Sequence, residues 1–134
     1  MNAPRDLSVA AQPWLVQAAE DLATARRLVD DGESPPRLAA FLAHLAAEKA
    51  LKGALIARGI ATRKIHDLVE LQSSLISDDA VTVSSDDIDI LVPWNIAGRY
   101  PTDLGDPGPE TAASAVDAAG RIVDALSRRV LPDG

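Results

Sequence analysis

The sequence predicts an all-α fold, an up-and-down bundle of about five helices. Apolar residues make up 47% of the chain, mostly alanine and leucine, while aromatic residues make up only 3%. Such a core comes from aliphatic helix faces, because β-sheet cores depend on Val, Ile, Thr, Tyr and Phe. Apolar residues also recur at helical spacing between Gly- and Pro-rich breaks. The 134 residues fit one domain, 1–134, with its core at about 13–131.

The first helix is expected to start after Pro13, since proline suits a first turn, and to run from Trp14 to about Asp31. Residues 1–12 are then a short flexible N-terminus. The sequence Gly32–Pro36 breaks the chain, and Ser34 is placed to cap the next helix. One side of the first helix is apolar: Trp14, Leu15, Ala18, Leu22, Ala25, Leu28 and Val29.

The second helix is predicted from Pro36 to Arg58, with Gly59 as the residue that ends it. A basic loop, 61–65, leads to a third helix that begins near His66 and Asp67 and reaches about Leu75. Residues 77–82 are expected to be a polar connection.

A fourth helix follows the capping sequence Ser84–Asp87 and must kink or end at Pro93. Residues 98–109 indicate a loop because they contain three prolines and three glycines. The last helix is predicted from Glu110 to Val130. Its apolar stripe is continuous: Ala112, Val116, Ala119, Val123, Leu126 and Val130.

Composition and charge exclude several classes of protein. The absence of cysteine excludes disulfides and thiolate metal sites. Met1–Pro13 lacks the pattern of a signal peptide, and no apolar run approaches the roughly 20 residues that cross a bilayer. We therefore expect a cytoplasmic protein with no membrane contact. No motif for a cofactor, a metal or a Ser-His-Asp triad is visible.

The formal net charge of −7 argues against broad, non-specific binding of nucleic acid. The charge is uneven, however. Between Arg37 and His66 there are six basic residues and one acid, so this segment carries +5 and the rest of the chain −12. An acidic protein with one basic band can present a local anion site.

Charged residues interrupt the apolar stripe of the second helix. Glu48, Lys49 and Lys52 fall on the arc that Leu38, Phe41, Leu45, Leu55 and Ile56 define, which we take as the inward face. Asp21 falls similarly on the inward arc of the first helix. Because a buried unpaired charge costs several kcal/mol, these groups must be paired, lie at an interface or line a cleft. Two interpretations stay open: a structural ion-pair network across the bundle, or lysines that line a groove for a phosphate-bearing ligand.

Four segments of the chain match, in order, the segments of one known family. Two of them are Trp14 with Glu20–Ala25, and His44–Leu55, which contains the run AEKALK. The other two are the run HDL at His66–Leu68 and the run RYP at Arg99–Pro101. Together they resemble the first two helices and two later segments of the HEPN domain family, over about residues 14–130. The resemblance implies a five-helix bundle, a homodimer, and a nucleotide or RNA ligand or a nucleotidyltransferase partner, often within toxin–antitoxin modules.

Some members of this family are metal-independent ribonucleases with an Arg followed by His after four to six residues. This chain departs from that signature, since Leu104, Gly105 and Asp106 stand at the required distance from Arg99. Arg37 and His44 satisfy the spacing but lie at the start of the second helix, which is the wrong place. No catalytic residue is therefore assigned.

The candidate residues each allow two interpretations. His66 is the best single base for RNA cleavage, or it simply opens the third helix with Asp67. His44 is expected to be a packed, hydrogen-bonded core residue. Arg99 and Tyr100 suit a phosphate and a base, or they brace the end of the bundle.

We therefore expect a non-catalytic HEPN-type module. Its candidate nucleotide- or anion-binding residues are Lys49, Lys52, Arg63, Lys64, His66, Arg99 and Tyr100, supported by the polar pair Asp21 and Glu48. The alternatives are a divergent ribonuclease that uses His66 or the pair Arg37 and His44, and a dimeric scaffold without a ligand. The wide apolar arc of the second helix, which includes Leu42, Leu51 and Ile56, leaves surface for self-association.

Overall fold

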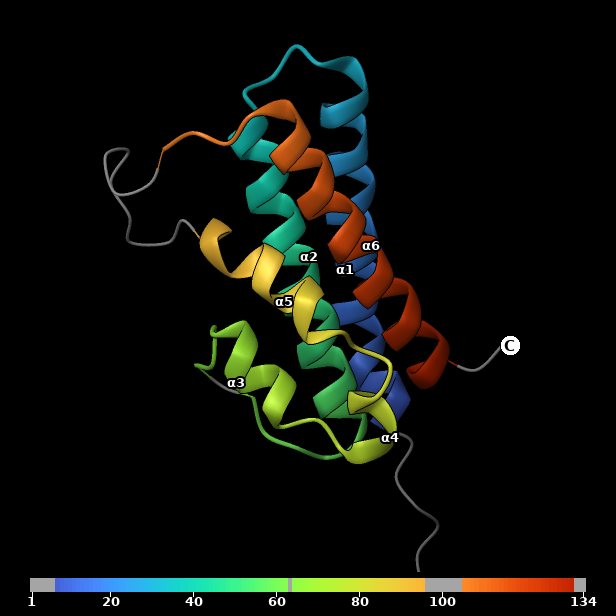
Figure 1. Ribbon diagram of the computed structural model, residues 1–134. Helices are drawn as coiled ribbons and strands as arrows, with labels where there is room; N and C mark the ends of the chain where they lie inside the picture. The colour runs from blue at the N-terminus through green and yellow to red at the C-terminus, as the bar shows by residue number, and fades with distance from the viewer. Residues whose placement is uncertain (1–6, 63, 96–104, 132–134) are drawn as a thin grey trace, which may run out of the picture.

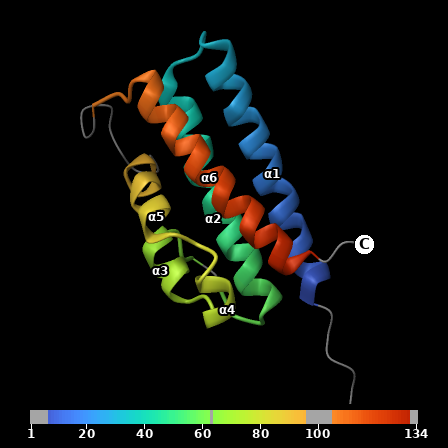
Figure 2. The same cartoon turned by 45° about the vertical axis from the view of Figure 1, so that its right-hand side comes forward.

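The computed structural model describes residues 7–62, 64–95 and 105–131. In these ranges there are six α-helices and one short 3-10 helix, and no strand, so the all-α prediction is confirmed. Three long helices, α1 (Leu7–Asp31), α2 (Pro36–Ala57) and α6 (Pro109–Val130), form the body of the bundle (Figure 1). The short helices α3 (Leu68–Ser73), α4 (Ser77–Ala80), α5 (Ser85–Leu91) and η1 (Val92–Trp94) run along one side of it (Figure 2).

Helix α1 begins two turns earlier than the sequence predicted. Pro13 lies inside it, and residues 7–12, expected to be flexible, are helical. A proline at this position leaves the carbonyl of Val9 without its helical partner. Because Val9 and Pro13 are both exposed, water can satisfy that group. Packing stabilises the extra turns, since Ala11 is fully buried and Leu7 lies against Gly59 at the end of α2.

The inward face of α2 agrees with the prediction only in part. Leu55, Glu48 and Lys52 of the predicted arc are buried, and so is Leu51. The larger part of the buried face consists of alanines, each at most 1% exposed: Ala39, Ala40, Ala43, Ala46, Ala47, Ala50 and Ala54. Leu38, by contrast, is 38% exposed, and Phe41 and Leu45 are partly exposed. The pattern of large apolar residues therefore misplaced the inward face in the N-terminal half of α2.

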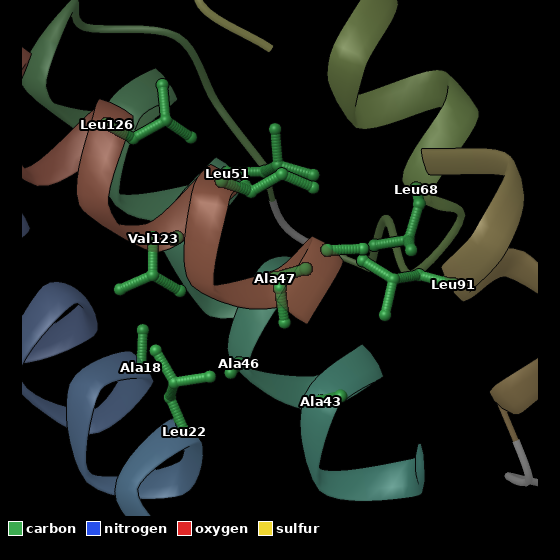
Figure 3. Close-up of a cluster of buried hydrophobic side chains, with 14 of the residues drawn as sticks. Ala18, Leu22, Ala43, Ala46, Ala47, Leu51, Leu68, Leu91, Val123 and Leu126 are labelled. Atoms are coloured by element: carbon green, nitrogen blue, oxygen red, sulfur yellow. The ribbon is translucent and has the colours of Figure 1, made fainter. Parts of the chain in front are cut away.

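The physical reason is that α2 packs against α1 and α6 at once. Small side chains let neighbouring helices approach closely, and close approach multiplies the van der Waals contacts. Figure 3 shows this centre, where Ala46 and Ala47 of α2 lie among Leu22 of α1 and Val123 of α6. Both alanines are fully buried.

The caps explain where the short helices begin. Asp67 accepts hydrogen bonds from the backbone N–H groups of Val69 and Glu70 at 2.8 and 3.2 Å, so α3 starts at Leu68. Ser84 accepts from the N–H of Asp86 and starts α5, as predicted. The cap predicted for Ser34 is wrong, because α2 starts after Pro35 with no side-chain cap.

The remaining boundaries agree with the sequence except in one segment. Residues 77–80, expected to be part of a polar connection, form α4. Helix α5 ends at Leu91 and continues as η1 through Pro93. Helix α6 buries its whole predicted stripe, with Asp117, Arg121, Asp124 and Arg128 on the exposed side.

Candidate functional site

Two charged residues of α2 are buried. Lys52 Nζ donates a hydrogen bond to Glu48 Oε2 at 3.0 Å, one helical turn away. The ammonium also lies over the ring of Trp14 on α1, 5.8 Å from its centroid. The carboxylate and the aromatic face both favour a positive charge at this position.

His66, in the loop that precedes α3, contacts both members of this pair. Its Nδ1 lies 3.0 Å from Glu48 Oε2 and 3.3 Å from Lys52 Nζ. A ring nitrogen that donates to the carboxylate cannot accept from the ammonium at the same time. With Nδ1 donating to Glu48, the Nε2 of His66 is left on the outer side of the ring, which is exposed to solvent.

His44 approaches the same carboxylate from the core. Its Nδ1 lies 2.9 Å from the carbonyl oxygen of Leu91, to which it donates, and its Nε2 lies 3.8 Å from Glu48 Oε1. His44 is buried, as the sequence predicted. Glu48 thus lies between one buried and one exposed imidazole.

A pocket of about 380 Å³ opens at this cluster. It is formed where α2, the start of α3 and η1 meet, and it is lined by His44, His66, Asp67, Leu68, Val92 and Asn95. The contributions of Val92 and Asn95 carried no signal in the sequence, because only tertiary packing brings η1 against α2. Asp67 lines the wall, but its carboxylate is engaged in capping α3.

Lys49 lies on another side of α2. Its Nζ donates to Asp21 Oδ2 of α1 at 2.8 Å, and both side chains are about 20% exposed. This contact joins α1 to α2 and does not line the pocket. Both lysines on α2 are therefore matched by an acid of the same chain.

Lys64 has a strained backbone, with a φ of +66° that is uncommon for a residue other than glycine. Its side chain is exposed, and it lies two residues before His66. The other candidates, Arg63, Arg99 and Tyr100, lie outside the described residues. Arg37 is exposed on the first turn of α2, seven residues before the buried His44, or about 10 Å along the axis.

A second buried charge cluster was missed in the sequence. The carboxylate of Asp79, on α4, is fully buried and accepts two hydrogen bonds from Arg58 at 2.9 and 3.0 Å and one from Arg129 at 3.2 Å. The hydrogen bond from Arg58, with a further one from Arg129, holds the pKa of Asp79 below its usual value. The same bond raises the pKa of Arg58. These contacts tie α4 to the ends of α2 and α6.

Asp87 makes a similar contact on α5. Arg121 of α6 donates to it through Nε and Nη2 at 2.8 to 3.1 Å, which raises the pKa of the arginine. The sequence identified Asp87 only as a first-turn acid. Both arginine clusters lie away from the pocket lining and serve to hold the short helices on the bundle.

Two further features bear on the chemistry. The described part of the chain contains no group of three or more His, Cys, Asp or Glu residues arranged to hold a metal ion. Nor does any described helix have the length and apolar character needed to cross a membrane. The pocket is lined by two imidazoles, one carboxylate, one amide and two apolar side chains, and the Glu48–Lys52 pair contacts His66 beside it.

Comparison with known proteins identifies the fold. TT1696 from Thermus thermophilus is 30% identical, with a TM-score of 0.73 over 89% of this chain and 97% of that one. ST0689, an archaeal HEPN homologue, is 26% identical, with a TM-score of 0.64 over 90% and 97% of the two chains. No curated protein matches significantly. The family model of the HEPN domain matches residues 11–130, and the chain therefore belongs to the HEPN domain family.

Proposed function

We propose that this chain is a non-catalytic HEPN-type binding module, a homodimer whose pocket takes a phosphate-bearing ligand, either a nucleotide or a segment of RNA. The observation that carries the proposal is the pocket of about 380 Å³ with His66 at its edge. Behind His66 stands the buried ammonium of Lys52. Because Nδ1 of His66 donates to Glu48, the outer Nε2 donates to a phosphate only when the ring is the imidazolium, with the ammonium of Lys52 close behind it.

The proposal divides the candidate residues by role. Lys49 and Lys52 are already matched by Asp21 and Glu48. In the proposal they therefore shape the electrostatic potential around the pocket and orient the side chains next to them. His66 and Lys64 are exposed and are therefore assigned the direct contacts. Arg63, Arg99 and Tyr100 remain proposed ligand residues on the strength of the sequence.

A thermal-shift titration with mono-, di- and triphosphate nucleotides and a short RNA tests the proposal. A ligand that binds only the folded state stabilises it by roughly 2.7 kcal/mol at a hundred times Kd. For 134 residues this raises Tm by roughly 10 °C. We expect His66→Ala and Lys64→Ala each to weaken binding by about tenfold or more, in line with the loss of a charged hydrogen bond.

Arg128→Ala is the matched control for Lys64→Ala, because it removes one positive charge from an exposed position on the outer side of α6. The control is expected to bind as the wild type does. A flat response to every ligand contradicts the pocket proposal. It would favour a protein partner, such as a nucleotidyltransferase of a toxin–antitoxin-like system, or a dimeric scaffold.

One observation favours a second candidate, a metal-independent ribonuclease. Glu48 holds Nδ1 of His66 at 3.0 Å, which is the way a carboxylate orients a catalytic imidazole. RNA cleavage needs a base for the 2′-hydroxyl and a cation for the developing charge, and Lys64 is the exposed cation two residues away. The alternative pair of Arg37 and His44 is less suitable, because His44 is buried and bonded to Leu91.

Incubation with a labelled RNA in the presence of a chelator separates the two functions. The binding module leaves the RNA intact. Cleavage that disappears in His66→Ala, and falls in Glu48→Gln while RNA affinity is kept, would establish the ribonuclease. Cleavage that persists in His66→Ala would contradict this site and point elsewhere in the chain.

A further inference from the structure

The ring of His66 has charged partners on its inner side and solvent on its outer side. On the inner side, Nδ1 lies 3.0 Å from Glu48 Oε2 and 3.3 Å from Lys52 Nζ. The side chain of His66 is 65% exposed, although Glu48 and Lys52 are buried. Because an imidazole has only two ring nitrogens, the partner of Nδ1 decides what Nε2 can offer to a ligand.

The shorter of the two inner contacts assigns the proton of Nδ1 to the hydrogen bond with Glu48. In the neutral ring Nε2 then carries a lone pair, which repels the oxygens of a phosphate or a sulfate. The opposite tautomer, in which Nδ1 accepts from Lys52, places two acceptors, Nδ1 and Glu48 Oε2, 3.0 Å apart. The neutral ring that fits the inner contacts is therefore the one that cannot donate to an anion.

We infer that the pocket binds its anion together with one proton, which Nε2 of His66 takes from solvent. This coupling rests on the proposed function and adds the regulation of the same site by pH. The imidazolium donates through Nδ1 to Glu48 and through Nε2 to the anion, so each hydrogen bond has one donor and one acceptor. The anion also brings a second negative charge to the ring, and a nearby negative charge favours the protonated form.

The other groups around the ring were considered as sources of the same pH dependence. Histidine is the side chain whose charge ordinarily changes between about pH 5 and 8. The second histidine, His44, is buried and donates to the carbonyl oxygen of Leu91, whereas His66 is exposed at the edge of the pocket. The ammonium of Lys52 opposes a positive charge on the ring. The charged or titratable groups that face or flank His66 are His44, Glu48 and Lys52 of α2 and, before and at the start of α3, Lys64 and Asp67; the end of η1 contributes Val92 and the neutral amide of Asn95.

The two functions proposed for this site need opposite forms of His66. A general base needs a free lone pair on Nε2, whereas a donor to an anion needs a proton there. Anion binding should therefore weaken as the pH rises. Cleavage of saturating RNA by His66 as a base would instead become faster over the same range.

Calorimetric titration of the full chain with sodium sulfate at constant ionic strength tests the inference, because the charge of sulfate is constant over the range used. Between about pH 5.5 and 8 we expect Kd to rise at least about tenfold, and by no more than about tenfold per pH unit, since one proton is taken up. The binding enthalpy should also vary with the ionisation enthalpy of the buffer, because the buffer supplies the proton. A short RNA, whose phosphodiesters keep their charge over this range, replaces sulfate if sulfate alone binds too weakly.

Two variants identify the group that takes up the proton. His66→Gln keeps a neutral N–H donor but cannot be protonated, so we expect weak binding that does not vary with pH. Glu48→Gln removes the charge that favours the imidazolium and should move the loss of affinity to lower pH. Asp124→Asn is the matched control, since it removes one negative charge from the exposed side of α6, and it should follow the wild type. If Glu48→Gln does not fold because it leaves Lys52 buried without its acid, the exposed His66 still provides the test.

The possible results separate this coupling from the proposed function. A wild-type Kd that does not change with pH, or a binding enthalpy that is equal in all buffers, overturns the coupling and leaves the pocket proposal intact. It would mean that Nδ1 accepts from Lys52 and that the neutral ring donates through Nε2. A pH dependence that persists in His66→Gln assigns the proton to another group and also overturns it. If neither sulfate nor RNA binds at any pH, the pocket proposal fails, and the coupling fails with it.

Discussion

The replacement Asp79→Asn tests whether the short helices are held on the bundle by one buried carboxylate. Asp79 is fully buried and accepts three hydrogen bonds, two of them from Arg58 and one from Arg129. An asparagine keeps the oxygen at Oδ1, which receives two of these bonds. It places an NH₂ group at Oδ2, where two donors then face each other. The variant therefore loses the negative charge and the bond from Arg58 Nε.

The expected cost follows from the exposure of the partners. Removing one member of a fully buried ion pair costs about 3–5 kcal/mol. Here the side chains of Arg58 and Arg129 are 32% and 38% exposed, so water can solvate their freed charges. We therefore expect Asp79→Asn to lower the free energy of unfolding by about 2–3 kcal/mol. For 134 residues this lowers Tm by roughly 7–10 °C.

Urea unfolding followed by circular dichroism at neutral pH measures this difference. Asp78→Asn is the control, because Asp78 is adjacent in sequence but 80% exposed. Its ion pair with Arg129 is long at 3.9 Å. It should change stability by less than about 0.5 kcal/mol. Equal effects of the two replacements, or no effect of Asp79→Asn, would refute the reasoning from burial.

The pH dependence gives a second check. The folded-state pKa of Asp79 lies below its ordinary value of 3.8, so the folded state binds this proton less readily than the unfolded state. Its contribution to stability is therefore complete above about pH 4 and is lost as the pH falls through the folded-state pKa. The stability gap between wild type and Asp79→Asn should stay constant down to about pH 4 and shrink below it. A gap that widens in acid would contradict the lowered pKa of Asp79 in the folded state.

Two further predictions concern glycine and a cap. A Cβ at Gly53 would lie 3.1 Å from Cγ of the buried Leu15, whereas a Cβ at Gly120 would meet only the end of the exposed Arg26 side chain. Gly53→Ala should therefore destabilise by about 1 kcal/mol and Gly120→Ala stabilise by about 0.5–1 kcal/mol, as measured by urea unfolding; effects of the same sign would contradict the packing argument. Asp67→Ala removes the cap of α3 and should cost about 1 kcal/mol, with faster amide exchange at Val69 and Glu70 as its signature.

The sequence alone predicted the features that depend on local backbone chemistry. Gly59 and Ser84 mark an end and a start of helices because a positive φ and a side-chain acceptor are local requirements. The stripe of α6 was found correctly because that helix has one buried side and one exposed side. Burial of Glu48 and Lys52 was predicted, and the pairing of Lys49 with Asp21 was one of two interpretations left open.

Tertiary structure decided what depends on several elements at once. The inward face of α2 is set by how closely α1 and α6 can approach. Seven alanines lie there beside Leu51 and Leu55, whereas Phe41 and Leu45 remain partly exposed. The burial of Asp79 depends on two arginines that are 21 and 50 residues away in the sequence. The pocket needs η1 beside α2, which no local pattern encodes. Hydrophobic periodicity reports that a helix has an apolar side, but the neighbours in space determine which side becomes the core.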